Sequence, residues 1–269
     1  MEALRKKAQE ILTGGQVKVI IGYGEGSPER ARAIFVQNPA EVDRLIFDGR
    51  CRQNLAVYLM KPEVRALGKL AITASKDVLR SILQLAAENQ LSDADIVVIG
   101  INDDGSVIEF ANLQAVEDHM KTAAATMSAD EEARARIAEI EKKPVEERWQ
   151  YWQEQLANCF KCYACRSACP MCYCSRCTVE CNQPQWIPAP SHKLGNLEWH
   201  MMRAMHLAGR CIECGECARA CPLGIPINLL TQKLAADMKD QFDWQAGMSL
   251  KVENPLSTFK PDDKENFIK

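Results

Sequence analysis

From Cys159 to Pro170 the chain reads CFKCYACRSACP, and from Cys211 to Pro222 it reads CIECGECARACP. Both stretches have the spacing C-x2-C-x2-C-x3-C-P. Three cysteines with two residues between neighbours can bind three irons on one face of a cubane cluster. The fourth cysteine, set after a longer spacer and before a proline, binds the other cluster in two-cluster ferredoxins. The repeat therefore predicts two 4Fe–4S clusters whose ligands cross between the two motifs.

This crossing divides the cysteines of the two motifs into two ligand sets. The first cluster takes Cys159, Cys162, Cys165 and Cys221, and the second cluster takes Cys211, Cys214, Cys217 and Cys169. Zinc is the alternative metal, but zinc sites pair two C-x2-C units and need neither a third cysteine in register nor a C-P pair. The spacer between the motifs is longer than in a compact bacterial ferredoxin, which predicts a more helical kind of two-cluster domain.

Five further cysteines lie outside the two motifs. The chain has 13 cysteines in all, and the five are Cys51, Cys172, Cys174, Cys177 and Cys181. Three alternatives stay open for them. They bind a third 4Fe–4S cluster, with Cys181 or Cys51 as its fourth ligand, or they bind zinc, or they are free thiols. Metal is favoured over free thiols, and a cluster over zinc.

The composition excludes several classes of protein. Apolar residues make up 47% of the chain and charged residues 26%, with 33 basic and 36 acidic residues and a net charge of −3. This balance predicts no binding of nucleic acid. No apolar run is long enough for a membrane span, and the start of the chain lacks the apolar region of a secretory signal. We therefore expect a cytoplasmic chain, in which clustered cysteines bind metal and do not form disulfides.

Periodicity predicts an α/β N-terminal domain followed by a mostly helical, ferredoxin-type domain with two 4Fe–4S clusters. In the first domain we expect strands at 17–21, 33–36, 70–73, 96–101 and 107–110 and helices at 2–13 and 78–88. The predicted divisions are an α/β domain at 1–117, a helical connector at 118–157, the iron–sulfur domain at 158–242 and an extended tail at 243–269. Helices at 194–207 and 227–238 belong to the iron–sulfur domain.

One glycine run follows the first predicted strand. Gly22-Tyr-Gly24-Glu-Gly26 is followed by Ser27 and Pro28, which breaks the pattern G-x-G-x-x-G of a dinucleotide-binding turn. The run therefore predicts a plain turn, and no bound flavin is expected. The sequence also lacks a recognisable set of catalytic residues, so we predict no catalytic residue. Five cations near the motifs would stabilise the reduced clusters: Lys161, Arg166, Arg176, Arg210 and Arg219.

The segment 159–177, with its extension C-P-M-C-Y-C-x-x-C, resembles iron–sulfur proteins related to the beta subunit of coenzyme F-420 hydrogenase and dehydrogenase. The segment 206–227 resembles the same group and the ferredoxin subunit of heterodisulfide reductase, and segments 49–55 and 95–101 resemble it more faintly. Where this chain has Asp77-Val78, relatives often carry a C-D pair, and where it has Asn102 they often carry a cysteine. The resemblance implies flavin or deazaflavin binding for enzymatic members; because of these departures, we expect no bound flavin here.

These observations favour an electron-transfer iron–sulfur subunit inside a larger anaerobic oxidoreductase complex. Its partners would be a hydrogenase, a formate dehydrogenase, a heterodisulfide-reductase-like protein or a flavin–NAD(P)H module, each a flavin- or metal-bearing subunit. The first alternative is a self-contained flavin- or deazaflavin-dependent reductase. The second is a non-catalytic scaffold or sensor stabilised by its clusters.

Overall fold

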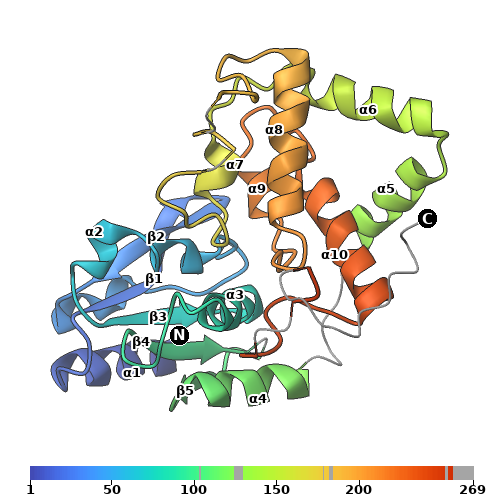
Figure 1. Cartoon of the computed structure of the whole chain (residues 1–269). Coiled ribbons are helices and arrows are strands. Elements are labelled where there is room, and N and C mark those ends of the chain that lie inside the picture. Colours follow the sequence, from blue (N-terminus) through green and yellow to red (C-terminus); the bar gives the residue numbers. More distant parts are fainter. Residues whose placement is uncertain (103, 124–129, 178, 182–183, 252–253, 257–269) are drawn as a thin grey trace.

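The computed structural model describes residues 1–256 except 103, 124–129, 178, 182–183 and 252–253. A mixed sheet with helices on both faces forms the N-terminal part, and the rest of the chain is helical (Figure 1). This arrangement confirms the predicted fold class. Among the described residues, no helix is both long and apolar enough to cross a membrane.

The sheet has five strands in the order β2-β1-β3-β4-β5. Strands β1 (Val19–Ser27), β3 (Leu70–Ala74) and β4 (Ile96–Ile101) are parallel, and β2 (Arg30–Val36) and β5 (Val107–Phe110) pair antiparallel with them at the two edges. The three central strands are nearly continuous apolar runs because both faces of the sheet are covered. All five predicted strands are therefore present.

Different helices cover the two faces of the sheet. On one face, α1 (Glu2–Thr13) and the 3-10 turn η1 (Pro39–Arg44) pack over Ile20 and Ile99. On the other face, α3 (Lys76–Ala87), α4 (Leu113–Ala123) and the 3-10 turn η2 (Leu55–Tyr58) pack over Ile21 and Ile72. The short helix α2 (Pro62–Arg65) lies before β3. The expected boundary between residues 117 and 118 falls inside α4.

The turn predicted for the glycine run is wrong. Residues 22–26 continue strand β1, which pairs with β2 as far as Ser27 and Arg30. A Cβ atom at Gly22 would lie 2.4 Å from Leu45 Cδ2, and one at Gly26 would lie 2.3 Å from the Arg30 carbonyl oxygen. Gly26 is therefore required by its close approach to the backbone of β2, and Gly22 leaves the space that the Leu45 side chain fills.

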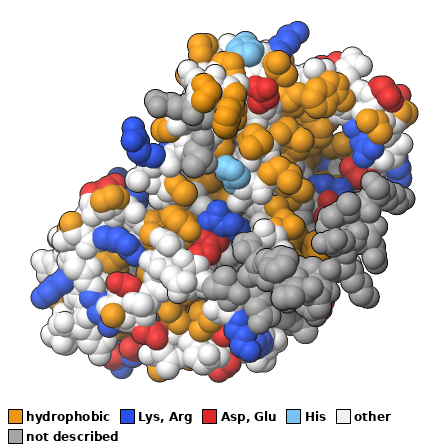
Figure 2. Space-filling view, in the orientation of Figure 1, with side chains coloured by type: hydrophobic (Ala, Val, Ile, Leu, Met, Phe, Trp, Pro, Cys, Tyr) orange, Lys and Arg blue, Asp and Glu red, His pale blue; other side chains and the backbone are white. Residues whose placement is uncertain are grey.

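The helical part is built from α5 (Glu131–Glu141), α6 (Val145–Ala157), α8 (Lys193–His206) and α10 (Asn228–Phe242). Helix α8 packs against α6 and α10, and α5 packs against α10. Apolar side chains gather on the surface over these helices, whereas charged side chains are scattered over the sheet part (Figure 2). Exposed members of this apolar surface include Met201 and Met205. The two short helices α7 (Ala164–Ser167) and α9 (Glu216–Arg219) lie within the cysteine motifs.

Helix α3 joins the two parts. It is buried almost all round, including Arg80 and Gln84, because the sheet lies on one side of it and the cysteine-containing segments on the other. At its end, Glu88 accepts hydrogen bonds from Arg210 Nε at 2.7 Å and from the Tyr173 hydroxyl at 2.7 Å. Both partners adjoin cysteines of the helical part, so Glu88 fixes that part against the sheet.

Replacing Glu88 by glutamine is expected to lower the free energy of unfolding by about 1–2 kcal/mol at neutral pH, because a half-buried ion pair is lost. Burial raises the pKa of Glu88. The hydrogen bond from Arg210, the attraction to its charge, and the hydrogen bonds from Tyr173 and Gln84 together outweigh burial. They hold the pKa of Glu88 below its ordinary value of 4.5. The stabilisation is therefore present above pH 4.5 and is lost as the pH falls through the lower, folded-state pKa.

Melting temperatures of wild-type protein and Glu88→Gln, measured between pH 7 and pH 3.5, would check this prediction. The difference between them should shrink on acidification. Glu109→Gln is the matched control, since Glu109 forms a surface ion pair with Lys7 at 3.3 Å and such pairs contribute little. A difference that stays constant with pH would contradict the ionic role of Glu88.

Candidate metal centre

The two cysteine motifs have the same backbone conformation. In each motif, two residues at equivalent positions have positive φ: Lys161 at 53° and Tyr163 at 58° in the first, and Glu213 at 65° and Gly215 at 72° in the second. Three of the four carry side chains, for which this left-handed conformation is costly. Such strain, repeated at the same positions, is typical of loops whose shape serves a binding site.

The strained loops direct backbone amides at the thiols. The amide of Lys161 donates to Cys159 Sγ at 3.4 Å, and the amide of Glu213 donates to Cys211 Sγ at the same distance. The amide of Glu216 faces the thiol of Cys214 in the same way. Hydrogen bonds to sulfur stabilise a thiolate and are one of the ways in which a protein sets the potential of an iron–sulfur cluster.

One cavity brings cysteines of both motifs together. Its lining includes Cys169 from the first motif and Cys211, Cys214 and Cys217 from the second, with Thr231 and Gln232 of α10 closing it. Pro170 and Met171, which follow Cys169 in sequence, also line it.

The remaining cysteines of the motifs gather around α7. Cys159 and Cys221 pack against one apolar cluster. Burial raises the pKa of Cys159, and the charges of Cys162 and Cys221 raise it further. Cys165 lies buried in the same apolar cluster as Cys159 and Cys221. Cys162 is exposed, so the group formed by Cys159, Cys162, Cys165 and Cys221 reaches the surface of the molecule.

Buried thiols in both groups require a cation to ionise. Burial raises the pKa of Cys165 and of Cys211 to about 11, and that of Cys214 to about 12. Such thiols are protonated and unreactive at neutral pH until a metal displaces the proton. Four soft sulfur ligands in a desolvated site suit iron–sulfur clusters. The residues present therefore fit the two clusters predicted from the motifs.

Most of the cations expected near the clusters have other partners. Lys161 donates to the carbonyls of Pro188 and Pro190, Arg166 pairs with Glu180, Arg210 pairs with Glu88 and Arg219 pairs with Glu216. Arg176 is exposed.

Two polar residues that sequence reasoning missed, His200 and Arg203, lie on the buried face of α8. His200 Nε2 lies 3.3 Å from Cys159 Sγ. Burial, with the charges of Arg203 and Lys161, lowers the pKa of His200 to about 4. A neutral imidazole therefore faces this thiol. Asn196 lies on the same face and donates to the Cys159 carbonyl at 2.7 Å. The spacing 196, 200 and 203 puts polar side chains on one helix face, and that stripe was the available signal.

The extra cysteines are placed differently from one another. The thiol of Cys172 contacts that of Cys169, and this hydrogen bond together with burial raises the pKa of Cys172. Cys177 is half-buried, whereas Cys174 and Cys181 are exposed. Within the described part of the chain, no three His, Cys, Asp or Glu side chains form a group that could hold a single metal ion such as zinc.

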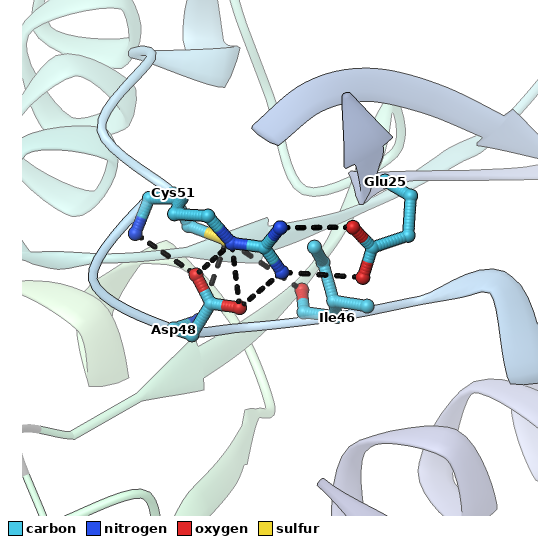
Figure 3. Close-up of polar contacts among 5 residues, drawn as sticks. Glu25, Ile46, Asp48 and Cys51 are labelled. Atoms are coloured by element: carbon cyan, nitrogen blue, oxygen red, sulfur yellow. Dashed lines mark hydrogen bonds and ion pairs between the residues drawn. The ribbon is translucent and has the colours of Figure 1, made fainter. Parts of the chain in front are cut away.

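Cys51 belongs to a loop of the sheet part. Its thiol accepts a hydrogen bond from the Asp48 amide at 3.4 Å and contacts the Ile46 carbonyl oxygen at 3.9 Å (Figure 3). Arg50 holds the loop closed through ion pairs with Asp48 at 2.8 Å and with Glu25 at 2.9 Å. The prediction that Cys51 ligates a third cluster stays untested.

A polar pocket lies beside Cys51 at the carboxyl ends of two parallel strands. It is lined by Ser75, Lys76 and Asp77 after β3, by Asn102, Asp104 and Gly105 after β4, and by Cys51, Arg52 and Arg219, among others. Arg219 belongs to the second cysteine motif, so the pocket opens next to that motif. Ligands of α/β proteins commonly bind at such an edge of the sheet.

Comparison with known proteins finds a family model that matches part of the chain. Residues 172–226 match the model of a family described as a 4Fe-4S dicluster domain. The match contains the second motif and the four cysteines from Cys172 to Cys181, and it begins after Cys169.

A curated relative is the F420-dependent formate dehydrogenase subunit beta of Methanocaldococcus jannaschii, with 31% identity over 121 residues. The alignment covers 44% of this chain and 30% of the relative, so the chain matches about a third of the relative's length. The chain therefore contains a ferredoxin-type 4Fe–4S dicluster domain, which implies two 4Fe–4S clusters, and is distantly homologous to a dehydrogenase beta subunit.

Proposed function

We propose that the chain is an electron-transfer subunit that relays single electrons within a larger oxidoreductase complex. The observation that carries the proposal is that the cysteines of the two motifs intermix: Cys169 lines a cavity with Cys211, Cys214 and Cys217, while Cys221 and Cys159 pack against the same apolar cluster. When bound, each cluster accepts and releases one electron. Two such sites joined by shared peptide segments suit electron transfer over a short path.

The ligand sets that this geometry supports are the crossed ones. Cys159, Cys162, Cys165 and Cys221 would hold the first cluster, and Cys211, Cys214, Cys217 and Cys169 the second. The amides of Lys161 and Glu213 would donate to sulfur in equivalent positions of the two sites. The neutral imidazole of His200 would face the first cluster alone.

The two sites differ in their access to a partner. Cys162 and its neighbour Phe160 are exposed, so the first site reaches the surface. The second site lies against α3, where Arg80 donates to the carbonyl of Ile212. We therefore infer that electrons exchange with a partner at the first site. The partner would be a flavin- or metal-bearing subunit, in keeping with the name of the relative, a subunit of a formate dehydrogenase.

Metal analysis and reduction tests address the proposal. Chain purified without oxygen is expected to contain about eight iron atoms, at four per cluster, and a value near twelve would add a third cluster at the extra cysteines. Dithionite should reduce the clusters. The chain alone should not oxidise NADH, NADPH or reduced deazaflavin, because these donors give up electrons in pairs and need a two-electron cofactor.

Three outcomes would contradict the proposal. About four or fewer iron atoms together with stoichiometric zinc would exclude the two clusters. Clusters that dithionite cannot reduce would favour a scaffold or sensor. Direct oxidation of NAD(P)H by the chain alone would favour an enzyme.

One observation favours a second candidate, a reductase that binds its own flavin or deazaflavin. The polar pocket at the carboxyl ends of β3 and β4 carries Lys76 and Arg52, and Arg219 links it to the second motif. A bound two-electron cofactor there would lie next to the second cluster. About one flavin per purified chain, lost in an Asp77→Leu variant that keeps its iron, would support this candidate over the relay.

A further inference from the structure

Arg203 lies between the two groups of motif cysteines. It is a buried residue of α8, with 4% of its surface exposed. Its Nη2 donates to the carbonyl oxygen of Cys165 at 3.1 Å. The same side chain lines the cavity formed by Cys169, Cys211 and Cys217. Arg203 therefore contacts the first motif and lines the site proposed for the second cluster.

The charge of Arg203 has an unusual set of partners. Within the described part of the chain, no ion pair with a carboxylate is formed by Arg203, and its Nε has no hydrogen-bond partner although it is buried. Arg166, Arg210 and Arg219 each pair with a glutamate. A guanidinium group stays charged inside a protein, and burial of an unpaired charge is costly.

Cysteines of both motifs surround Arg203. Its side chain contacts Cys165 of the first motif, and it lines one cavity with Cys169 of the first motif and with Cys211, Cys214 and Cys217 of the second. Thiolates held by metal at these cysteines would supply the negative charge that a buried guanidinium group without a carboxylate partner needs.

We infer that Arg203 is a shared cation that raises the reduction potentials of both clusters together. The inference rests on the ligand sets proposed above. Each arriving electron adds one negative charge to a site, with no bond made or broken and no proton moved. A fixed positive charge in a desolvated interior stabilises that added charge. Because Arg203 lies against both sites, it favours the reduced state of each.

A shared cation has a consequence that separate cations lack. When the reduction potentials of both clusters shift in the same direction, the free-energy difference for moving an electron between them stays nearly constant. Electrons then pass between the clusters in either direction with little change in driving force. A cation at one site alone would instead trap electrons there.

Arg203→Gln and Arg203→Lys test the inference, with Arg166→Gln and Arg219→Gln as controls from the two motifs. The measurements are iron content and an EPR-monitored redox titration of both clusters. Arg203→Gln keeps a hydrogen-bond donor but removes the charge, so both potentials should fall. Arg203→Lys keeps the charge, so both potentials should stay close to wild type. In the control variants both potentials should shift less than in Arg203→Gln.

Each contrary result has its own meaning. If Arg203→Gln binds two clusters and shifts one potential or none, the shared-cation inference fails and the relay proposal stands. If Arg203→Gln loses its iron, Arg203→Lys decides: two clusters with wild-type potentials support the inference. If Arg203→Lys also loses its iron, or if its potentials shift as much as those of Arg203→Gln, Arg203 has a structural role and the shared-cation inference is overturned. Wild-type protein without two reducible clusters would refute the proposed function itself.

Discussion

Replacing Cys221 by alanine is expected to remove the first cluster and to leave the second in place, so the iron content should fall from about eight to about four atoms. The reason is the crossing of the ligands. Cys221 follows the three cysteines of the second motif in sequence, but it packs against the same apolar cluster as Cys159 and Cys165 of the first. Cys169 is the mirror case, because it lines the cavity of the second motif. Cys169→Ala should therefore remove the second cluster.

EPR spectra of the two reduced variants would identify which cluster each has lost. Cys51→Ala is the control, since the Cys51 thiol contacts the backbone of its own loop, and both motif clusters should remain. Loss of the second-motif cluster in Cys221→Ala would overturn the crossed assignment. Cys181→Ala, compared with Cys51→Ala, also addresses the third site: unchanged iron in both would leave these two residues as free thiols.

The cysteine motifs were readable from the sequence because their chemistry is local. The spacing of Cys159, Cys162 and Cys165 prescribes a loop that presents three sulfurs to one face of a cluster, whatever the rest of the chain does. The repeat at Cys211–Cys221 then implies the second cluster. The dicluster match over residues 172–226 agrees with that prediction. The apolar runs of β3 and β4 were equally local signals, since strands covered on both faces admit few polar residues.

Other features depend on contacts between distant segments, which the sequence pattern does not encode. The glycines at 22 and 26 look like a turn, but Gly26 is required by the backbone of Arg30, and Gly22 leaves space for the Leu45 side chain. Arg203 looks like one more cation on a solvated helix. Its burial follows from the packing of α8 against both cysteine groups. A charged residue that falls on the apolar face of a predicted helix is the sequence signal that would identify such residues.

The extended tail expected from residue 243 has a structural role near the second motif. It forms no helix or strand in its described part, but Ala246 is buried and its carbonyl oxygen accepts from Arg80 Nη2 at 3.0 Å. Arg80 Nη1 also donates to the Ile212 carbonyl, within the second motif, at 2.8 Å. Helix α3 thereby holds the tail and the cysteine loop against the sheet through one guanidinium group.

Replacing Arg80 by alanine is expected to lower the free energy of unfolding by about 3–4 kcal/mol, because it leaves buried carbonyl oxygens of Ile212 and Ala246 without donors. Arg80 also forms an ion pair with Glu213 at 3.5 Å, and the Glu213 amide donates to Cys211 Sγ. The loop that presents Cys211 should therefore loosen. Iron from the second cluster should then be released to a chelator faster, while release from the first cluster changes little.

Arg65→Ala is the matched control for this experiment. Arg65 likewise donates to two backbone carbonyls, those of Leu59 at 3.1 Å and Gln90 at 2.6 Å, but both lie in the sheet part. It should lower the melting temperature without changing iron release. If Arg80→Ala speeds release from both clusters equally, the variant is acting through global unfolding. If it leaves release from the second cluster unchanged, α3 does not support that site. The distinction matters because Arg80 of α3 contacts the second site. Only a local effect would show that the N-terminal part stabilises one particular cluster.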